Sequence, residues 1–252
     1  MTEEQSQNGY TLIELILVLV IIGIITTVGL NSLTEVNQTN RFEETRFEMD
    51  RLAAAIVGDP SLVSGGVRTD FGYVGDVGSL PLNLNALTTN PGGYATWSGP
   101  YYGDEFSTDG SSASFKLDAW GRAYTYSGGT TITSTGGATT LTRNLAINTD
   151  DLLNNNVTVV VYDLDHTPPG ATYRDSVRVV LSYPNGGGSV TNSSVTPRSD
   201  GSAFFDSIPI GIHLVRIVYV PTADTLQRKI VVNVGQDSYA EISLADTLWS
   251  GN

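Results

Sequence analysis

The chain has 252 residues and a formal net charge of -13, because it contains 26 acidic and only 13 basic residues. An acidic surface repels phosphate backbones and disfavours nucleic-acid binding. The lack of cysteine excludes disulfides, thiolate catalysis and cysteine-based metal sites.

The first predicted element is a helix that begins in a nearly continuous apolar run from Leu12 to Leu30. A helix of this length spans roughly 28 Å at about 1.5 Å per residue, close to the hydrocarbon thickness of a bilayer. A secretory signal peptide fits poorly, because no basic residue precedes the run and no small-residue cleavage site follows it. Glu14 is anomalous here, since a carboxylate in a membrane helix is costly and usually marks a function with a partner nearby.

The helix is expected to continue past the apolar run to about Val57. Gly58-Asp59-Pro60 is expected to end it. Oppositely charged pairs such as Arg46 and Asp50 lie at helical spacing on its polar side. The later apolar positions share one helical face, which predicts that it packs under a globular head: Phe42, Met49, Leu52 and Ile56.

The segment Gly9-Tyr10-Thr11-Leu12-Ile13-Glu14 resembles the class III signal of type IV pilins and type II secretion pseudopilins. The resemblance implies that a prepilin peptidase cuts after Gly9 and that Tyr10 is then N-methylated. It also implies that Glu14 pairs with the N-terminal amine of an adjacent subunit. In an apolar filament core such a pair offsets the desolvation of both groups, and removing one partner strands a buried charge.

Two features depart from the pattern of this family. The leader contains Glu3 and Glu4 but no basic residue, whereas positive charge normally keeps that end cytoplasmic. Asn31 stands where many members have a helix-bending proline. The helix is therefore either straighter here or bends at Gly29 and Asn31.

Residues 58–150 are predicted to form a first globular module of short strands and dense turns. Strands are expected at 115–117, 123–126 and 141–147, and residues 82–87 are expected to form a short helix or a loop.

Two aromatic motifs stand out in this module, Trp97-Ser98-Gly99-Pro100-Tyr101-Tyr102 and Asp118-Ala119-Trp120-Gly121-Arg122-Ala123-Tyr124-Thr125-Tyr126. Gly-Pro and Trp-Gly favour turns, and Trp and Tyr supply large buried areas with polar ends. Asp118 is expected to cap the turn through backbone N–H groups. An aromatic platform for carbohydrate is the alternative interpretation.

The two motifs together resemble the head of the type II secretion major pseudopilin, where the second one enters the β-sheet. The resemblance favours a pseudopilin over an adhesive type IV pilin, as does the lack of C-terminal cysteines. It assigns a structural role to nine residues: Trp97, Gly99, Pro100, Tyr101, Asp118, Trp120, Gly121, Tyr124 and Tyr126.

Major pseudopilins usually hold calcium in a loop after this sheet. Asn148, Asp150 and Asp151 stand at the corresponding distance and supply the oxygen ligands that calcium prefers. Calcium is the one cofactor that the resemblance implies. A polar linker over residues 148–156 explains the same residues without a metal.

Residues 157–246 are predicted to form a second module, an antiparallel β-sandwich, from strands at 157–162, 176–182, 203–205, 212–220, 227–234 and 239–244. The stretch 200–215 resembles carboxypeptidase-regulatory-like and transthyretin-like domains. His213 is expected to face solvent, and His166 is expected to lie in a polar loop rather than in a metal site.

The sequence thus predicts an α+β protein: a leader (1–9), a transmembrane and polymerisation helix (10–57), a small β-sheet pilin head (58–150) and an all-β sandwich (157–246). No common catalytic motif is present, so a non-enzymatic role is predicted. The predicted role is a structural subunit of a type II secretion pseudopilus or related pilin-like filament. The alternative is a minor or surface-displayed pilin whose sandwich binds a ligand.

The resemblance also implies partners and a location. The expected partners are further copies of the chain, other pseudopilins, a prepilin peptidase and methyltransferase, and an inner-membrane platform with a cytoplasmic ATPase. The expected location is the bacterial inner membrane, crossed once, with the head in the periplasm or outside.

Overall fold

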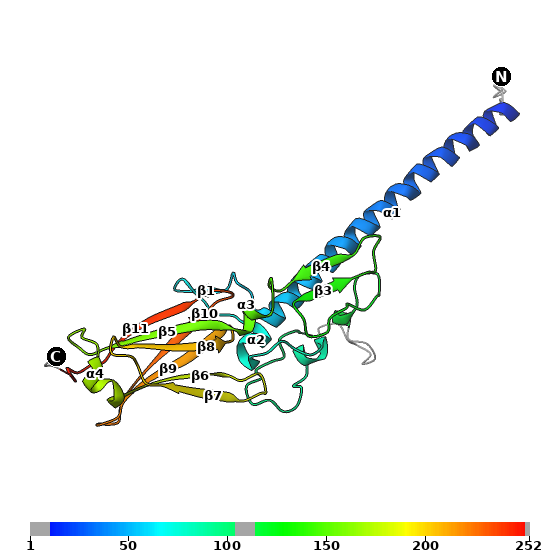
Figure 1. The fold of residues 1–252 in the computed structure, drawn as a ribbon. Coiled ribbons are helices and arrows are strands. Elements are labelled where there is room, and N and C mark those ends of the chain that lie inside the picture. The colour runs from blue at the N-terminus through cyan, green and yellow to red at the C-terminus, as the bar shows by residue number, and fades with distance from the viewer. Residues whose placement is uncertain (1–10, 104–113, 250–252) are drawn as a thin grey trace, which may run out of the picture.

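The computed structural model describes residues 11–103 and 114–249, except for the side chains of residues 28–34 and 114. Figure 1 shows a long helix that projects from a globular body made of short helices and β-sheets. The predicted α+β class is therefore confirmed. Gly9 and Tyr10 lie outside the described residues.

Helix α1 is continuous over Leu12–Val57 (46 residues), as its periodicity predicts, with no interruption at residues 29–31. It begins at the N-cap Thr11 and ends at Gly58, which has a φ of 81° and donates its N–H to the carbonyl of Ala54. Residues 11–27 are all exposed. Within the described part of the chain, no helix combines the length and the apolar character needed to cross a membrane.

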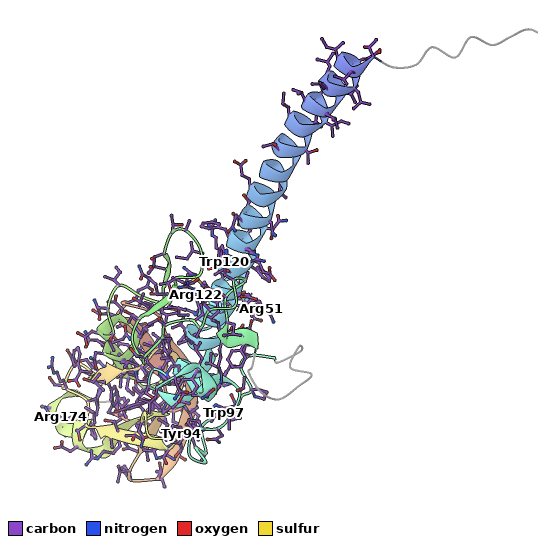
Figure 2. All side chains as sticks on the ribbon, turned by 90° about the vertical axis from the view of Figure 1, so that its right-hand side faces the viewer. Arg51, Tyr94, Trp97, Trp120, Arg122 and Arg174 are labelled. Atoms are coloured by element: carbon purple, nitrogen blue, oxygen red, sulfur yellow. The ribbon has the colours of Figure 1, made fainter. Side chains whose placement is uncertain are left out.

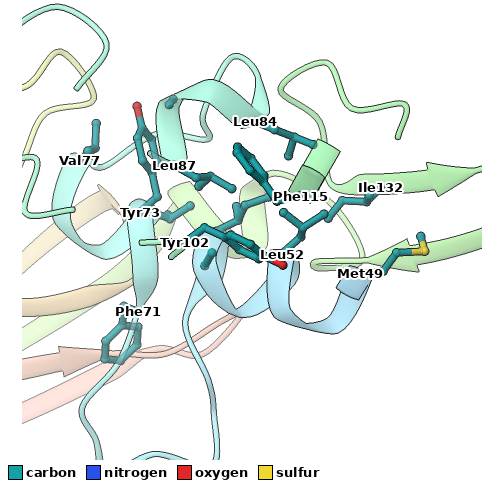
Figure 3. Packing of buried hydrophobic residues seen from close by; sticks show 14 of the residues in the cluster. Met49, Leu52, Phe71, Tyr73, Val77, Leu84, Leu87, Tyr102, Phe115 and Ile132 are labelled. Carbon is teal, nitrogen blue, oxygen red and sulfur yellow. The ribbon is translucent and has the colours of Figure 1, made fainter. Parts of the chain in front are cut away.

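The head packs against the last turns of α1, where Figure 3 shows Met49 and Leu52 in the core. Thr45 and Ile56 are buried on the same face of the helix. It contains a small hairpin of β1 (Val63–Ser64) and β2 (Val67–Arg68), helix α2 (Gly72–Val77), and the 3₁₀ turns η1 (Leu84–Leu87) and η2 (Ser114–Lys116). A second hairpin, β3 (Thr131–Ser134) and β4 (Leu141–Asn144), lies alongside α1 (Figure 1). The apolar face predicted for the helix is therefore confirmed.

The head differs in detail from the predicted strands. Residues 114–116 form a 3₁₀ turn, and two isolated bridges stand in place of the predicted strands: Leu117 pairs with Ala123, and Thr125 pairs with Thr133 of β3. Backbone groups in this motif bond instead to the Asp118 side chain and to helix α1, which replaces regular strand pairing.

A β-sandwich follows the short helix α3 (Asp150–Leu153). One sheet has the order β10-β9-β6-β7 and the other β11-β5-β8. Their bounds are β5 Asn155–Tyr162, β6 Val177–Pro184, β7 Val190–Val195, β8 Ser202–Ile208, β9 Gly211–Tyr219, β10 Asp224–Val232 and β11 Ser238–Ser243, with α4 (Gly170–Tyr173) and η3 (Arg174–Ser176) between β5 and β6.

Both sheets contribute to one core, which includes Val159, Leu181, Phe205, Ile217 and Ile242. All pairings are antiparallel except that of β11 with β5, which is parallel. Strand β7 was not predicted, because its sequence is mostly Thr, Asn and Ser and lacks an apolar face.

The head and the sandwich interlock rather than meet through a linker. The loop between β6 and β7 reaches the end of α2, where Gly186 N donates to the Val77 carbonyl (2.8 Å) and Gly188 O accepts from Ala95 N (2.9 Å). Ile210 from the sandwich is fully buried in the core of the head. These contacts make the body a single interlocked unit.

Candidate assembly site and the elements that hold it

The candidate assembly residue Glu14 lies in the first turn of α1. Its Oε2 accepts from Thr11 N (3.4 Å), and its N–H donates to Thr11 Oγ1 (3.3 Å), which makes a reciprocal capping box. This arrangement satisfies two of the unpaired N–H groups at the helix start. Glu14 is the one charged residue among residues 12–27, and all of these residues are exposed. The carboxylate therefore lies near the start of a helical segment whose apolar surface has no protein contact within the described chain.

The other end of α1 is held by the second aromatic motif. Asp118 is 4% exposed and lies at the centre of this motif. Its Oδ1 accepts from the backbone N–H groups of Trp120 (3.1 Å) and Arg122 (2.9 Å). Its Oδ2 accepts from Ser134 Oγ (2.6 Å) and Gly136 N (3.1 Å). The carboxylate therefore joins the motif turn to the β3–β4 hairpin, a wider role than the predicted turn cap.

Three contacts connect this turn to α1. Ala119 N donates to Oγ1 of the fully buried Thr45 (3.1 Å), and Trp120 Nε1 donates to Gln38 Oε1 (2.9 Å). Tyr124 Oη donates to Glu48 Oε2 (2.6 Å). Figure 2 shows Trp120 beside the helix where α1 enters the body. Thr45 was not predicted from the sequence, although its spacing from Met49 and Leu52 places it on the buried face.

The Tyr124–Glu48 pair titrates unusually because it is buried. Burial raises the pKa of Tyr124, and the bond to Glu48 raises it further. Burial likewise raises the pKa of the Glu48 carboxyl above its ordinary value.

Two other residues of the second aromatic motif also have defined environments. Gly121 has a φ of 80°, which favours glycine in the turn. The Oη of Tyr126 is buried and has no hydrogen-bond partner within the described residues, and burial raises its pKa.

The first aromatic motif closes the opposite side of the head core. Trp97 Nε1 donates to the Ala86 carbonyl (2.9 Å), and the Trp97 and Tyr101 rings meet edge to face at 5.6 Å. A Cβ on Gly99 would lie 2.5 Å from the Trp97 ring, so only glycine fits, and the next peptide bond to Pro100 is cis. Figure 2 labels Trp97 on the body, away from the free end of α1.

Tyr101 also bonds to Asp76, a residue with no predicted role. Tyr101 Oη donates to Asp76 Oδ2 (3.0 Å), and the Ser98 hydroxyl bonds to the same carboxylate oxygen. Burial raises the pKa of Tyr101 to about 12. The aromatic rings are thus packed and hydrogen-bonded within the head.

The three candidate calcium residues surround the start of α3. Asn148 Oδ1 accepts from Asp151 N (2.9 Å) and Asp151 Oδ2 accepts from Asn148 N (3.3 Å), while Asp150 Oδ1 accepts from Asn154 Nδ2 (2.6 Å). Among the residues that the structure describes, no group of three or more His, Cys, Asp or Glu is placed to hold a metal ion. The three side chains bond within the segment 148–154, and calcium binding stays a prediction.

The prediction that His213 faces solvent is wrong. Its side chain is 2% exposed rather than solvent-facing, because His213 shares strand parity with the core residues Val215 and Ile217. Its Nε2 lies 2.7 Å from the Pro209 carbonyl, and its Nδ1 is buried without a partner in the described residues. Burial lowers the pKa of His213. His166 lies in a turn with a φ of 58° and stacks on Tyr162 at 4.1 Å.

Comparison with known proteins identifies the N-terminal segment. Residues 5–30 match the family described as the prokaryotic N-terminal methylation motif. No curated protein sequence matches the chain significantly.

Solved structures give only distant likenesses. One is the dioxygenase domain of a dioxygenase and carbohydrate-binding protein fusion from Streptomyces sp. SirexAA-E (12% identity, 38% of this chain, 81% of that chain, TM-score 0.30). Another is the Bacillus anthracis TIE protein (16% identity, 50% of this chain, 24% of that chain, TM-score 0.29). At these TM-scores neither likeness bears on function. The methylation motif does: this chain carries a type IV pilin-like N-terminus of the kind that a prepilin peptidase processes.

Proposed function

We propose that the chain is a structural subunit of a pilin-like filament, specifically of a type II secretion pseudopilus. The observation that supports this most strongly is the combination of the methylation motif with a helix whose described first turns are entirely exposed and apolar apart from Glu14. In water such a surface is unfavourable, at about 25 cal/mol per Å² of apolar area. Lipid and the helices of other copies are the two environments that cover it.

In this proposal Glu14 makes the specific contact between copies. In the isolated chain its carboxylate caps its own helix through Thr11. After cleavage following Gly9, the new amine of Tyr10 would lie within a turn of this carboxylate or of a neighbour's. An ammonium from an adjacent copy offsets the desolvation of the carboxylate when the helices pack together.

The architecture of the body supports the same role. The second aromatic motif and Thr45 fix the body to one face of α1 and leave the first half of the helix free (Figure 1). In this proposal the apolar run spans the inner membrane once before assembly and forms the filament core afterwards. A membrane platform with its ATPase, other pseudopilins and the prepilin peptidase complete the machinery.

The test is intact mass measurement, with N-terminal sequencing, of protein isolated from its native membrane. Chains that begin at N-methylated Tyr10 and sediment in filaments would support the proposal. Chains that begin at Met1 or Thr2 would overturn it, because an unprocessed leader blocks the pairing of Glu14 with an amine.

A further inference from the structure

The outer face of the four-stranded sheet β10-β9-β6-β7 is basic, although the whole chain has a net charge of -13. Successive residues of a strand point to opposite faces of a sheet. In β9, Val215 and Ile217 pack in the sandwich core, so the residues that alternate with them form the outer face together with their cross-strand partners. The outer positions of the four strands carry three cationic residues, Lys229, Arg216 and Arg178, and no acidic one.

The three cationic residues lie on one diagonal across the sheet, each on a neighbouring strand. Lys229 on β10 pairs with Leu214 on β9, and Arg216 is two residues further along β9. Arg216 pairs with Val180 on β6, and Arg178 is two residues further in the same direction. Diagonal neighbours of this kind are about 7 to 8 Å apart. The face therefore presents three positive charges in a line at nearly even spacing.

Most of this charge has no partner within the described chain. Lys229 is exposed and takes part in no ion pair there, and Arg216 Nε is buried without a hydrogen-bond partner. Arg178 Nη1 donates to the backbone carbonyls of Asp175 and Val177 (3.0 Å each), which carry no net charge. The diagonal therefore keeps its positive charge in the isolated chain.

The acidic residues near the far end of the face are themselves balanced. Asp175, three residues before Arg178, pairs with Arg174 at 3.6 Å. Asp224 at the start of β10 is offset by the exposed Arg228 on the same edge strand. Neither carboxylate neutralises the diagonal.

The basic stretch ends where β9 meets the head. There Ile212 lines a pocket of about 280 Å³ together with Asp70 and Asp76. Both carboxylates accept hydrogen bonds within the head, Asp70 from Gly72 N (3.1 Å) and Asp76 from Tyr101 Oη (3.0 Å). Arg216 is four residues further along the strand, about 13 Å away. The carboxylates therefore mark the limit of the basic face.

The composition of the face indicates which kind of anionic partner fits it. Its other outer positions hold aliphatic or small polar residues, such as Leu214 and Val218, and none holds an aromatic ring. Nucleobases are held largely by stacking on aromatic side chains, and sugar rings pack on such side chains in the same way. A glutamate side chain needs no such platform, because its methylene groups pack on aliphatic residues. The face therefore suits an acidic polypeptide better than a nucleic acid or a glycan.

We infer that this face binds an acidic segment of another polypeptide, extended and with carboxylates at alternate positions. Alternate residues of an extended chain are about 7 Å apart and point to the same side, which matches the spacing of the diagonal. None of the strands that the structure describes contains two acidic residues, so a second copy does not supply such a segment from these strands. The inference goes beyond the proposed function and does not depend on it.

The test uses a fluorescein-labelled peptide with glutamate at three alternate positions and threonine between them. It is titrated with the full chain in a non-ionic detergent at low ionic strength, and fluorescence anisotropy measures binding. A control peptide has the same three glutamates in a row, so that they cannot all face the sheet. The alternating peptide should bind about threefold more tightly than the control, and added salt should weaken its binding.

Variants of the chain locate the binding site. Because Lys229 is exposed, K229Q should fold normally, and it should weaken binding of the alternating peptide by about threefold. K229E reverses the charge and should weaken binding further. R122Q removes an exposed cation from the head and serves as the matched control, which should bind the peptide as the wild type does.

Several outcomes would overturn the inference. Among them are no binding at low ionic strength, equal affinity for the two peptides, and equal effects of K229Q and R122Q. Tighter binding of an oligogalacturonate with the same number of carboxylates would assign the face to a glycan. Self-association of the chain that K229E abolishes would assign it to a second copy. None of these measurements depends on N-terminal processing, so each leaves the filament role to its own test.

Discussion

Tyr124 donates a 2.6 Å hydrogen bond to Glu48 and so ties the aromatic turn of the head to the assembly helix. An exposed pair elsewhere has the same chemistry and the same length, since Tyr239 Oη donates to Glu241 at 2.6 Å. The two pairs differ in burial, because Tyr124 is 8% exposed and Tyr239 is 60% exposed. They allow the contribution of a buried tyrosine–carboxylate bond to be measured against a matched one at the surface.

We predict that Y124F lowers the free energy of unfolding by about 1.5 to 3 kcal/mol, because it leaves the half-buried Glu48 carboxylate without its donor. Y239F should change stability by less than about 0.5 kcal/mol, since water replaces the lost bond. Denaturant unfolding of the full chain in detergent, followed by circular dichroism, measures both. Equal losses would show that Tyr124 does not hold the head to α1.

The four hydrogen bonds that the Asp118 carboxylate accepts lead to a second prediction. D118N keeps the shape of the side chain but replaces an acceptor with an NH₂ group, which faces either the two backbone donors or Ser134 and Gly136. A loss of about 2 to 4 kcal/mol is expected. The exposed Asp206 provides the control, and D206N should be nearly neutral. A D118N chain as stable as D206N would contradict the assigned role.

The contact between the head and the loop that joins β6 to β7 can be tested with two glycines, Gly78 and Gly66, which have the same φ of 80°. A Cβ on Gly78 would lie 2.2 Å from the Pro184 carbonyl, whereas a Cβ on Gly66 would meet open space. Both alanine variants share the backbone strain, about 1 kcal/mol. G78A should in addition open this contact and expose the loop 184–189 to limited proteolysis. Similar digestion of G78A and G66A would mean that the two modules do not depend on this contact.

His213 predicts a pH dependence. Burial lowers its pKa below 6.5, so the native state favours the neutral imidazole. Its contribution to stability is therefore full above pH 6.5 and is lost as the pH falls through and below that value. The melting temperature of the wild type should fall more steeply than that of H213Q between pH 7 and 5. A slope in H213Q as steep as that of the wild type would contradict the prediction.

Glu14 provides the prediction about assembly. E14A should leave membrane insertion intact and abolish efficient polymerisation, because no carboxylate remains to pair with the amine of a neighbour. E14Q separates charge from capping, since glutamine can still accept a bond from Thr11 N. Filament yield by sedimentation and microscopy is the measurement. Normal filaments from either variant would contradict the proposed pairing of the Glu14 carboxylate with the amine of a neighbouring copy.

Local pattern was enough to predict the helix and most of the sandwich. The spacing of Met49, Leu52 and Ile56 and the Gly58-Asp59-Pro60 stop locate α1 almost to the residue. Alternating apolar residues likewise locate β5, β6 and β9. These features depend on neighbours within a few positions along the chain, which the sequence displays directly.

The remaining features depend on partners far away in sequence. The residues around Ala119 do not indicate that its N–H donates to Thr45. The residues around Gly186 likewise do not indicate that its N–H donates to the Val77 carbonyl. The polar strand β7 forms because it pairs with β6, not because of its own composition. His213 was misplaced because its neighbours Ile212 and Leu214 were taken as the buried set, while the packed face runs through Val215 and Ile217.

The parallel pairing of β11 with β5 has a mechanical consequence. Strand β5 is attached to the head at its first residue, and β11 ends at the end of the body far from α1 (Figure 1), where Leu244 and Trp249 pack into the sandwich core. Tension between the base of the helix and an object held at the C-terminal end would therefore pull these strands in opposite directions along their length. The ladder from Ser238–Val157 to Ser243–Tyr162 would be loaded in shear, with its bonds sharing the force instead of opening one after another.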